Sequence, residues 1–275
     1  MITMPRALLA LALVASAAPA ARAQTDFYNT DRGRPLTIED AIVVERRAFE
    51  LQAAPLTFQR VARGVSHWGV APELAWGFAP RTQMELSLPI AVEDDGTRRQ
   101  ALVAAAGMEF ELLHQLNAET TLMPALALGA GVHLPVGPLA PTRALPVVRG
   151  LLTRTMGWGR FHLNGAYTPG EDLAPTDPGV MEANRWQAGL AVDRTFALRS
   201  LLVGAEVFAQ APLLAGGETE WRTSVGVRQQ VTPRLAMDAG IGRRLSEGQS
   251  GWTFTMGAAY AFAPPGMPGF QGGAR

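Results

Sequence analysis

The chain of 275 residues contains no cysteine and no lysine. The absence of cysteine excludes disulfide frameworks, thiolate metal sites and cysteine nucleophiles. All 24 basic residues are arginine, and 24 acidic residues balance them. This balance argues against a nucleic-acid partner, because nucleic-acid-binding proteins carry a basic surplus. Beyond the first residues, no stretch reaches the ~18 uninterrupted apolar residues of a membrane helix. The sequence is nevertheless 48% hydrophobic, so it is not a disordered polar chain.

The first 23 residues have the pattern of a secretory signal peptide. Arg6 precedes the apolar run 7–18, and Ala21-Arg22-Ala23 places small residues at the two positions that signal peptidase recognises. The alternative is an N-terminal membrane anchor, but the apolar run is shorter than the ~20 residues of a membrane span. We therefore predict cleavage near Ala23 and export across the inner membrane.

From residue 48 onward the hydrophobic pattern has a period of two, which is typical of β-strands with two different faces. In 83–92, for example, Met84 and Leu86 lie on one face, and Glu85 and Ser87 lie on the other. The pattern predicts twelve strands at residues 48–59, 66–78, 83–92, 101–116, 121–136, 145–156, 160–169, 184–196, 200–211, 220–231, 234–245 and 251–262.

The links between these strands alternate in length. Longer links, such as 93–100 and 170–183, follow odd-numbered strands, and tight turns, such as 79–82 and 157–159, follow even-numbered ones. Long loops on one rim, short turns on the other and an even strand count are typical of an outer-membrane β-barrel. A soluble β-sandwich also alternates in hydrophobicity, so the strand pattern alone leaves both open.

The aromatic residues favour the membrane barrel because they gather at strand ends. An apolar band between two aromatic girdles is what a lipid bilayer requires, whereas a soluble core gives no reason for it. The predicted girdle consists of Trp68, Trp76, Trp186, Trp221, Trp252, Tyr260 and Phe262. The sequence therefore predicts an all-β fold, an antiparallel up-and-down transmembrane β-barrel of about twelve strands over residues 48–262, in contact with outer-membrane lipid.

The strand face opposite the large apolar residues carries the charges. A charge that faces lipid at mid-depth costs about 2–4 kcal/mol, so we expect these side chains to line the lumen. Acids concentrate on the second to fourth strands, and arginines on the sixth to eighth and the tenth; the strand that contains Arg149 is ambiguous. An acidic wall that faces a basic wall would orient small polar solutes in a pathway. Alternatively, the acids and arginines would pair with one another and fill the interior. The predicted lumen residues are Glu73, Glu85, Glu109, Glu111, Arg160, Arg185, Asp193, Glu206, Arg222, Arg228 and Asp238.

Two segments flank the predicted barrel. Residues 24–47 precede it, and Thr37-Ile38-Glu39-Asp40 resembles a helix N-cap, which predicts a short helix over about 38–47. This helical or extended segment would lie either in the lumen as a plug or in the periplasm. Residues 263–275 are rich in proline and glycine, so we expect a disordered tail.

The sequence contains no pattern that predicts an enzyme, a bound metal or a cofactor. The four histidines lack the spacing of a metal motif such as His-Glu-x-x-His. An outer-membrane phospholipase is the enzymatic alternative, because such enzymes are also twelve-stranded barrels. That family carries a His-x-Ser-Asn-Gly segment, and the nearest match here, His162-Leu163-Asn164-Gly165, has no serine nucleophile.

Several short motifs carry a resemblance to a known family. They are the run 29–36, Glu39-Asp40-Ala41, Phe49-Glu50-Leu51, His67-Trp68-Gly69, Pro72-Glu73-Leu74 and Asp238-Ala239-Gly240. With these motifs the chain resembles bacterial outer-membrane proteins grouped under the MetA pathway of phenol degradation. The resemblance implies a barrel labelled as a transporter, with hydrophobic or aromatic solutes, and it carries over no catalytic residue. The barrel assembly machinery would insert such a protein, although thirteen residues follow Phe262, the last residue of the final predicted strand.

The leading hypothesis is therefore a passive outer-membrane channel or transporter for small solutes. The main alternative is a structural or adhesive barrel with a filled lumen, and a phospholipase-like enzyme is a more remote one.

Overall fold

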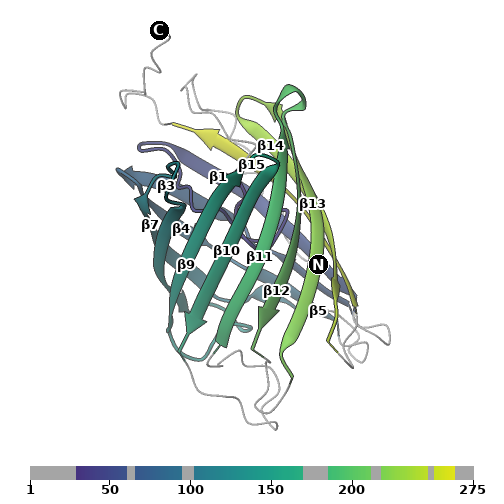
Figure 1. The fold of residues 1–275 in the computed structure, drawn as a ribbon. Coiled ribbons are helices and arrows are strands. Elements are labelled where there is room, and N and C mark those ends of the chain that lie inside the picture. The colour runs from purple at the N-terminus through teal and green to yellow at the C-terminus, as the bar shows by residue number, and fades with distance from the viewer. Residues whose placement is uncertain are drawn as a thin grey trace.

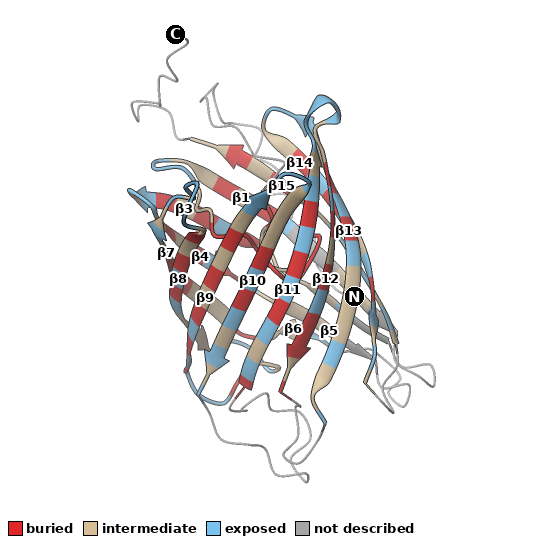
Figure 2. Cartoon of the chain, viewed as in Figure 1, coloured by how far each residue is buried: buried red, intermediate tan, exposed pale blue. Residues whose placement is uncertain are grey.

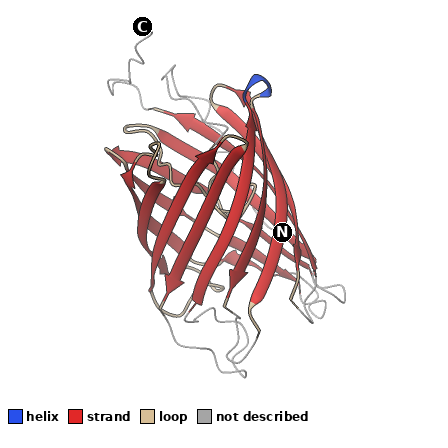
Figure 3. Cartoon of the chain, viewed as in Figure 1, coloured by secondary structure: helices blue, strands red, loops and turns tan. Residues whose placement is uncertain are grey.

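A computed structural model describes residues 29–60, 66–94, 102–169, 185–211, 218–246 and 251–263. Most of these residues lie in antiparallel strands that form a barrel (Figures 1 and 3). The barrel closes because the first and last strands pair with each other, from Phe49 opposite Phe262 to Arg60 opposite Trp252. The predicted signal peptide and nearly all of the predicted tail lie outside the described residues.

The strands are β1 (Phe49–Arg60), β2 (Ser66–Val70), β3 (Glu73–Ala79), β4 (Thr82–Ser87), β5 (Ile90–Asp94), β6 (Leu102–Ala105), β7 (Met108–Asn117), β8 (Ala125–Leu134), β9 (Leu145–Met156), β10 (Gly159–Thr168), β11 (Arg185–Phe196), β12 (Leu201–Gln210), β13 (Glu220–Thr232), β14 (Leu235–Arg244) and β15 (Gly251–Phe262). A single 3₁₀ turn, η1 (Ala197–Arg199), is the one helical element among the described residues. Within that part of the chain, no helix is long and apolar enough to cross a membrane.

These segments make twelve barrel strands, which confirms the predicted all-β barrel. Three barrel strands, predicted as continuous, are each interrupted once, at Ala71-Pro72, Leu88-Pro89 and Ala106-Gly107. The interruptions adjoin one another, because Leu88 donates its N–H to the Pro72 carbonyl (3.0 Å) and Ala106 donates to the Pro89 carbonyl (2.8 Å). Proline has no backbone N–H, so it cannot donate the second hydrogen bond to the neighbouring strand. The paired prolines therefore account for the break in the hydrogen-bonded ladder.

The two faces of the barrel wall differ as the sequence predicts. Exposed and buried residues alternate along the strands (Figure 2). Large apolar side chains are exposed on the outer face all around the ring, as with Leu86 on β4, Leu128 on β8, Leu190 on β11 and Met237 on β14. Such a continuous apolar belt is unfavourable in water and favourable against acyl chains. The barrel therefore spans a membrane, and closed barrels with this loop layout are those of the outer membrane.

Aromatic side chains lie near both rims. At the loop rim Trp68 packs on Phe58, with ring centroids 4.4 Å apart. At the short-turn rim Phe49 stacks on Trp76 and on Phe262, each at 5.5 Å. The remaining predicted girdle residues also lie near strand ends: Trp186, Trp221 and Trp252 are exposed at the starts of β11, β13 and β15, and Tyr260 lies near the end of β15. Their role as membrane anchors stays a prediction.

Two predictions of local structure are wrong. The predicted strand 121–136 begins late, at Ala125, because Asn117 donates its side-chain amide to the Pro124 carbonyl (2.6 Å) and closes a turn. The predicted helix over 38–47 is absent, and these residues form an irregular extended segment. Side chains of the barrel wall accept several of its backbone N–H groups, so a helix is not needed to satisfy them.

The apolar outer face gives a stability test. Leu190→Arg places a charge on the lipid face near the middle of β11, and we expect it to destabilise the barrel in lipid vesicles by about 2–4 kcal/mol. Leu198→Arg is the matched control, because Leu198 is fully exposed in the η1 turn at the barrel rim. Denaturant unfolding measures both. Equal, small effects for the two variants would contradict a membrane-facing outer surface, since surface changes in water stay within about ±0.5 kcal/mol.

Candidate functional site

Residues 29–48, named here the plug segment, cross the inside of the barrel. The N–H groups of Thr37 and Ile38 donate to the Glu206 carboxylate on β12, at 2.7 and 2.9 Å. Farther along, Ala41 donates to Thr153 on β9 (2.9 Å), and Val44 donates to Gln83 on β4 (2.5 Å). The segment therefore runs from one wall to the opposite wall before it enters β1.

The plug segment packs closely because the facing wall is built from small residues. A side chain at Gly226, Gly204 or Gly189 would meet Pro35, Leu36 or Ile38 respectively. Leu36 and Ile38 are almost fully buried and form an apolar cluster with Ala191 and Phe208. Ala41 forms a second cluster with Leu113, Ala125, Ala127 and Leu151. Glycine and alanine on the inner face thus leave room for a chain inside a narrow barrel.

Acidic residues of the plug segment meet arginines of the wall. Asp31 pairs with Arg228 on β13. Glu39 pairs with Arg149 on β9, which also binds Glu111 on β7 at 2.9 Å. These contacts place Arg149, whose face the sequence left ambiguous, inside the barrel.

A third acid on this side, Asp40, pairs with Arg160 on β10 at 3.2 Å. Arg160 in turn binds Asp193 on β11 at 2.7 Å. Together, the three plug acids face arginines that lie on β9, β10 and β13.

Basic residues of the plug segment meet acids of the wall. Arg32 binds Glu109 on β7 at 2.7 Å and lies 3.6 Å from Glu111. Arg34 is fully buried and binds Asp238 on β14 at 3.0 Å. The charges of the plug segment are therefore complementary to those of the two walls, and they neutralise much of the transverse field that the barrel alone would have.

One chain of hydrogen bonds has the residue types of a hydrolase triad. Thr153 lies 3.0 Å from one ring nitrogen of His162, and Asp193 lies 2.9 Å from the other. The Thr153 hydroxyl also accepts the Ala41 N–H of the plug segment. All three side chains are buried, and the plug segment covers the hydroxyl. The chain of bonds therefore anchors the plug segment and leaves no accessible nucleophile.

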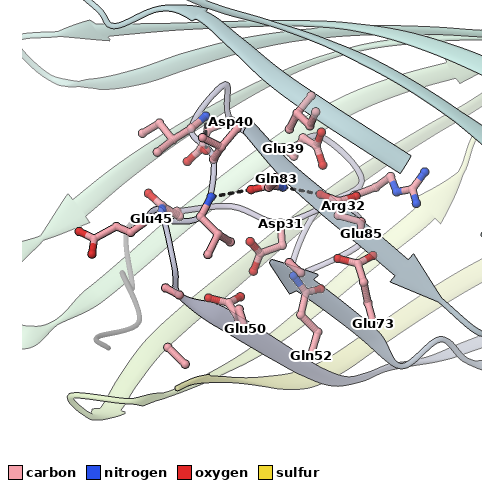
Figure 4. A pocket seen from close by; sticks show the side chains of 18 of the residues that line it. Asp31, Arg32, Glu39, Asp40, Glu45, Glu50, Gln52, Glu73, Gln83 and Glu85 are labelled. Atoms are coloured by element: carbon pink, nitrogen blue, oxygen red, sulfur yellow. Dashed lines mark hydrogen bonds between the residues drawn. The ribbon is translucent and has the colours of Figure 1, made fainter. Parts of the chain in front are cut away.

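Cavities remain on both sides of the plug segment. On the loop side, one cavity of about 470 Å³ is lined by residues that include Leu145, Arg185 and Phe208. A second, of about 310 Å³, is lined by residues that include Arg222 and Gly242. On the short-turn side a cavity of about 50 Å³ lies among acids, as Figure 4 shows. Among the described residues, no cluster of His, Cys, Asp or Glu has the geometry of a metal site.

All eleven predicted lumen residues lie on the inner face. Asp31, Arg32, Arg34 and Asp40 of the plug segment contact five of them: Glu109, Glu111, Arg160, Arg228 and Asp238. Asp193 pairs with Arg160, Glu206 holds the plug backbone, and Glu73 and Glu85 line the short-turn cavity. Arg185 and Arg222 line the loop-side cavities. That these residues line a solute pathway stays a prediction.

The sequence interpretation missed the plug residues that complete these contacts. Their signal is the charged run Asp31-Arg32-Gly33-Arg34, followed by Glu39-Asp40, just before the first strand.

No protein-family model matches the chain, and no curated protein sequence matches it. Solved structures do match. The COG4313 outer membrane channel from Pseudomonas putida F1 matches with a TM-score of 0.56 and 12% identity, over 85% of this chain and 100% of that one. The NanC porin matches with a TM-score of 0.51 and 7% identity, over 77% and 98% of the two chains. The KdgM porin matches with a TM-score of 0.50 and 12% identity, over 78% and 99%. At this identity the chain shares the fold of outer-membrane channels.

The anchoring of the plug segment is testable because the chain has no cysteine of its own. A single Ile38→Cys substitution places a thiol where the side chain is 1% exposed, and we expect slow labelling by a maleimide. Adding Glu206→Gln replaces a charged acceptor with a neutral one, which roughly halves the strength of the bonds to Thr37 and Ile38. Labelling should then accelerate by roughly tenfold.

The matched control is Glu218→Gln, since Glu218 is exposed on the loop rim. If Ile38→Cys is labelled rapidly without any second substitution, the plug segment does not lie buried at this position.

Proposed function

We propose that the protein is a passive outer-membrane channel for small solutes and that the plug segment closes it in the conformation seen here. The observation that carries the proposal is the lumen itself. Two cavities of about 470 and 310 Å³ lie on the loop side, and the plug segment separates them from the short-turn side. A lumen that is hollow on one side and closed by one segment suits a gated pathway better than a solid interior.

The way in which the plug segment is attached supports this proposal. Among the described residues, its one β-bridge to the barrel is Arg46 opposite Gly77. Backbone hydrogen bonds from Arg47 to Gly77 and from Gly77 to Ala48 lie at the same point, next to β1, and the remaining contacts are side-chain hydrogen bonds, ion pairs and apolar packing. The segment can therefore leave while every barrel strand keeps both of its neighbours, and no unpaired strand edge is exposed to lipid.

One observation favours the second candidate, a structural barrel with a filled lumen. Arg34 and Arg228 are fully buried at the centre of an ion-pair network with Asp31 and Asp238. Breaking a buried ion pair by removing one partner typically costs about 3–5 kcal/mol. A network of this kind holds the plug segment firmly, so the two candidates differ in whether the closed state ever opens.

Single-channel recording in planar bilayers separates the two candidates. The double variant Asp31→Asn/Asp40→Asn removes the charges that bind Arg228 and Arg160, so we expect longer openings and a higher mean conductance than in the wild type. Glu119→Gln is the matched control, because Glu119 binds Arg154 and Thr155 outside the lumen. If the double variant is folded but remains electrically silent, the channel proposal is wrong and the filled barrel stands.

A steric variant tests the same point without a change in charge. Gly226→Val should push a side chain against Pro35, since even a Cβ atom would lie only 2.6 Å from the Pro35 Cβ. We expect this variant also to raise conductance. Gly150→Val is its control, because a Cβ at Gly150 meets nothing closer than Leu128 at 3.9 Å. Equal conductance in the two glycine variants would mean that displacement of the plug segment does not open the lumen.

The MetA-pathway resemblance supports a finer proposal, that the solutes include hydrophobic or aromatic compounds. The absence of a described metal cluster and the buried position of Thr153 give no support to the phospholipase alternative. Insertion by the barrel assembly machinery likewise remains a proposal.

A further inference from the structure

We propose that Arg185 and Arg222 form a binding site for a small organic carboxylate with an apolar body, on the loop side of the plug segment. This inference rests on the proposed channel function and names the solute class that would bind above the closure.

The two arginines lie on neighbouring parts of one wall. Arg185 begins β11 and lines the larger loop-side cavity, and Arg222 on β13 lines the smaller one. Gly33 and Thr37 of the plug segment line both cavities, so the two spaces adjoin above it. Phe208 on β12, between the two strands, packs under the Arg222 guanidinium at 5.0 Å from the ring centre.

These two arginines differ from the other lumen arginines in their partners. Among the described residues, neither has a carboxylate within 4.0 Å. Arg185 donates to the Ala211 carbonyl (3.2 Å) and Arg222 donates to the Thr37 hydroxyl (2.7 Å), which are neutral acceptors. In each, the Nε–H is buried and has no hydrogen-bond partner within the part of the chain that the structure describes. Arg185 is itself only 9% exposed, and a buried charge without a counter-ion is unfavourable.

The carboxylates near this wall are already engaged. Glu206 accepts the N–H groups of Thr37 and Ile38 and the hydroxyl of Ser224. Glu220 accepts from Gln210 (2.5 Å) and from Arg244 (3.3 Å).

Across the barrel, the acids that line the larger cavity are paired with another residue or lie far from the two arginines. Glu109 binds Arg32, and Glu73 lies on β3, six strands away from β11 in the sheet order. Arg185 and Arg222 therefore give the wall of β11–β13 positive charge that no described carboxylate neutralises, and this charge would attract an anion.

The shape and lining of the cavity define the rest of the ligand. Besides its polar groups, the larger cavity is lined by apolar side chains, among them Leu145 and Val147 on β9, Phe208 on β12 and Ile38 of the plug segment. A cavity with an apolar lining and a few placed polar groups is typical of a small-molecule site. An arginine fork matches the two oxygens of a carboxylate. A ligand with a carboxylate at one end and an apolar body at the other satisfies both parts.

Calorimetric titration of the full-length protein in detergent tests the site, with sodium benzoate as the probe. We expect saturable binding of benzoate, and binding at least about tenfold weaker for benzyl alcohol, which has the ring without the charge. Arg185→Gln and Arg222→Gln should each weaken benzoate binding by about tenfold or more. Arg185→Lys should bind with intermediate affinity, because it keeps the charge and loses the fork.

Arg243→Gln is the matched control. Arg243 lies on the outer face of β14, over the Trp252 ring, so this variant removes the same charge outside the lumen. Circular dichroism and thermal unfolding show that each variant is folded. Absence of benzoate binding in the wild type, or equal affinity in Arg185→Gln and Arg243→Gln, would overturn the inference.

Bilayer recording distinguishes a failure of the proposed binding site from a failure of the proposed channel function. Benzoate binding by a protein that never conducts, even as Asp31→Asn/Asp40→Asn, would support the site and refute the channel. A conducting protein that does not bind benzoate would refute the site alone.

Discussion

The charge complementarity between the plug segment and the barrel wall is the interaction on which the structure of the lumen depends. A closed barrel in lipid must turn its charged side chains inward, and an inner charge without a partner is costly. Here a single extended segment supplies those partners, with Asp31 opposite Arg228 and Arg34 opposite Asp238. Without that segment, two walls of opposite sign would face an empty lumen.

An irregular chain inside a barrel also has to satisfy its own backbone. The plug segment does this through the wall side chains, since Glu206, Thr153 and Gln83 accept its N–H groups. It forms no helix because those acceptors already take the place of an intrahelical ladder. Small residues on the facing strands, such as Gly204 and Gly226, let the chain come close enough for these bonds.

The result is a lumen with two distinct halves. Ion pairs and apolar clusters hold the plug segment against the wall, and the acidic cavity on its short-turn side is small. Near the loops, cavities remain, and they contain the two arginines that lack carboxylate partners among the described residues. The fold that the protein shares with outer-membrane channels supplies the barrel, the proposed gating depends on the plug segment, and the proposed anion site depends on Arg185 and Arg222.

The sequence by itself determined the barrel, its twelve strands and the inward face of residues such as Glu111 and Arg228. It could do so because side-chain alternation is a local property and lipid penalises any other register. It did not determine the interruptions at Ala71-Pro72 and its neighbours, which depend on prolines meeting across strands. Nor did it place the plug segment, whose capping pattern predicted a helix. Only the tertiary structure decided that position, because the partners of Asp31 and Glu39 lie more than a hundred residues away.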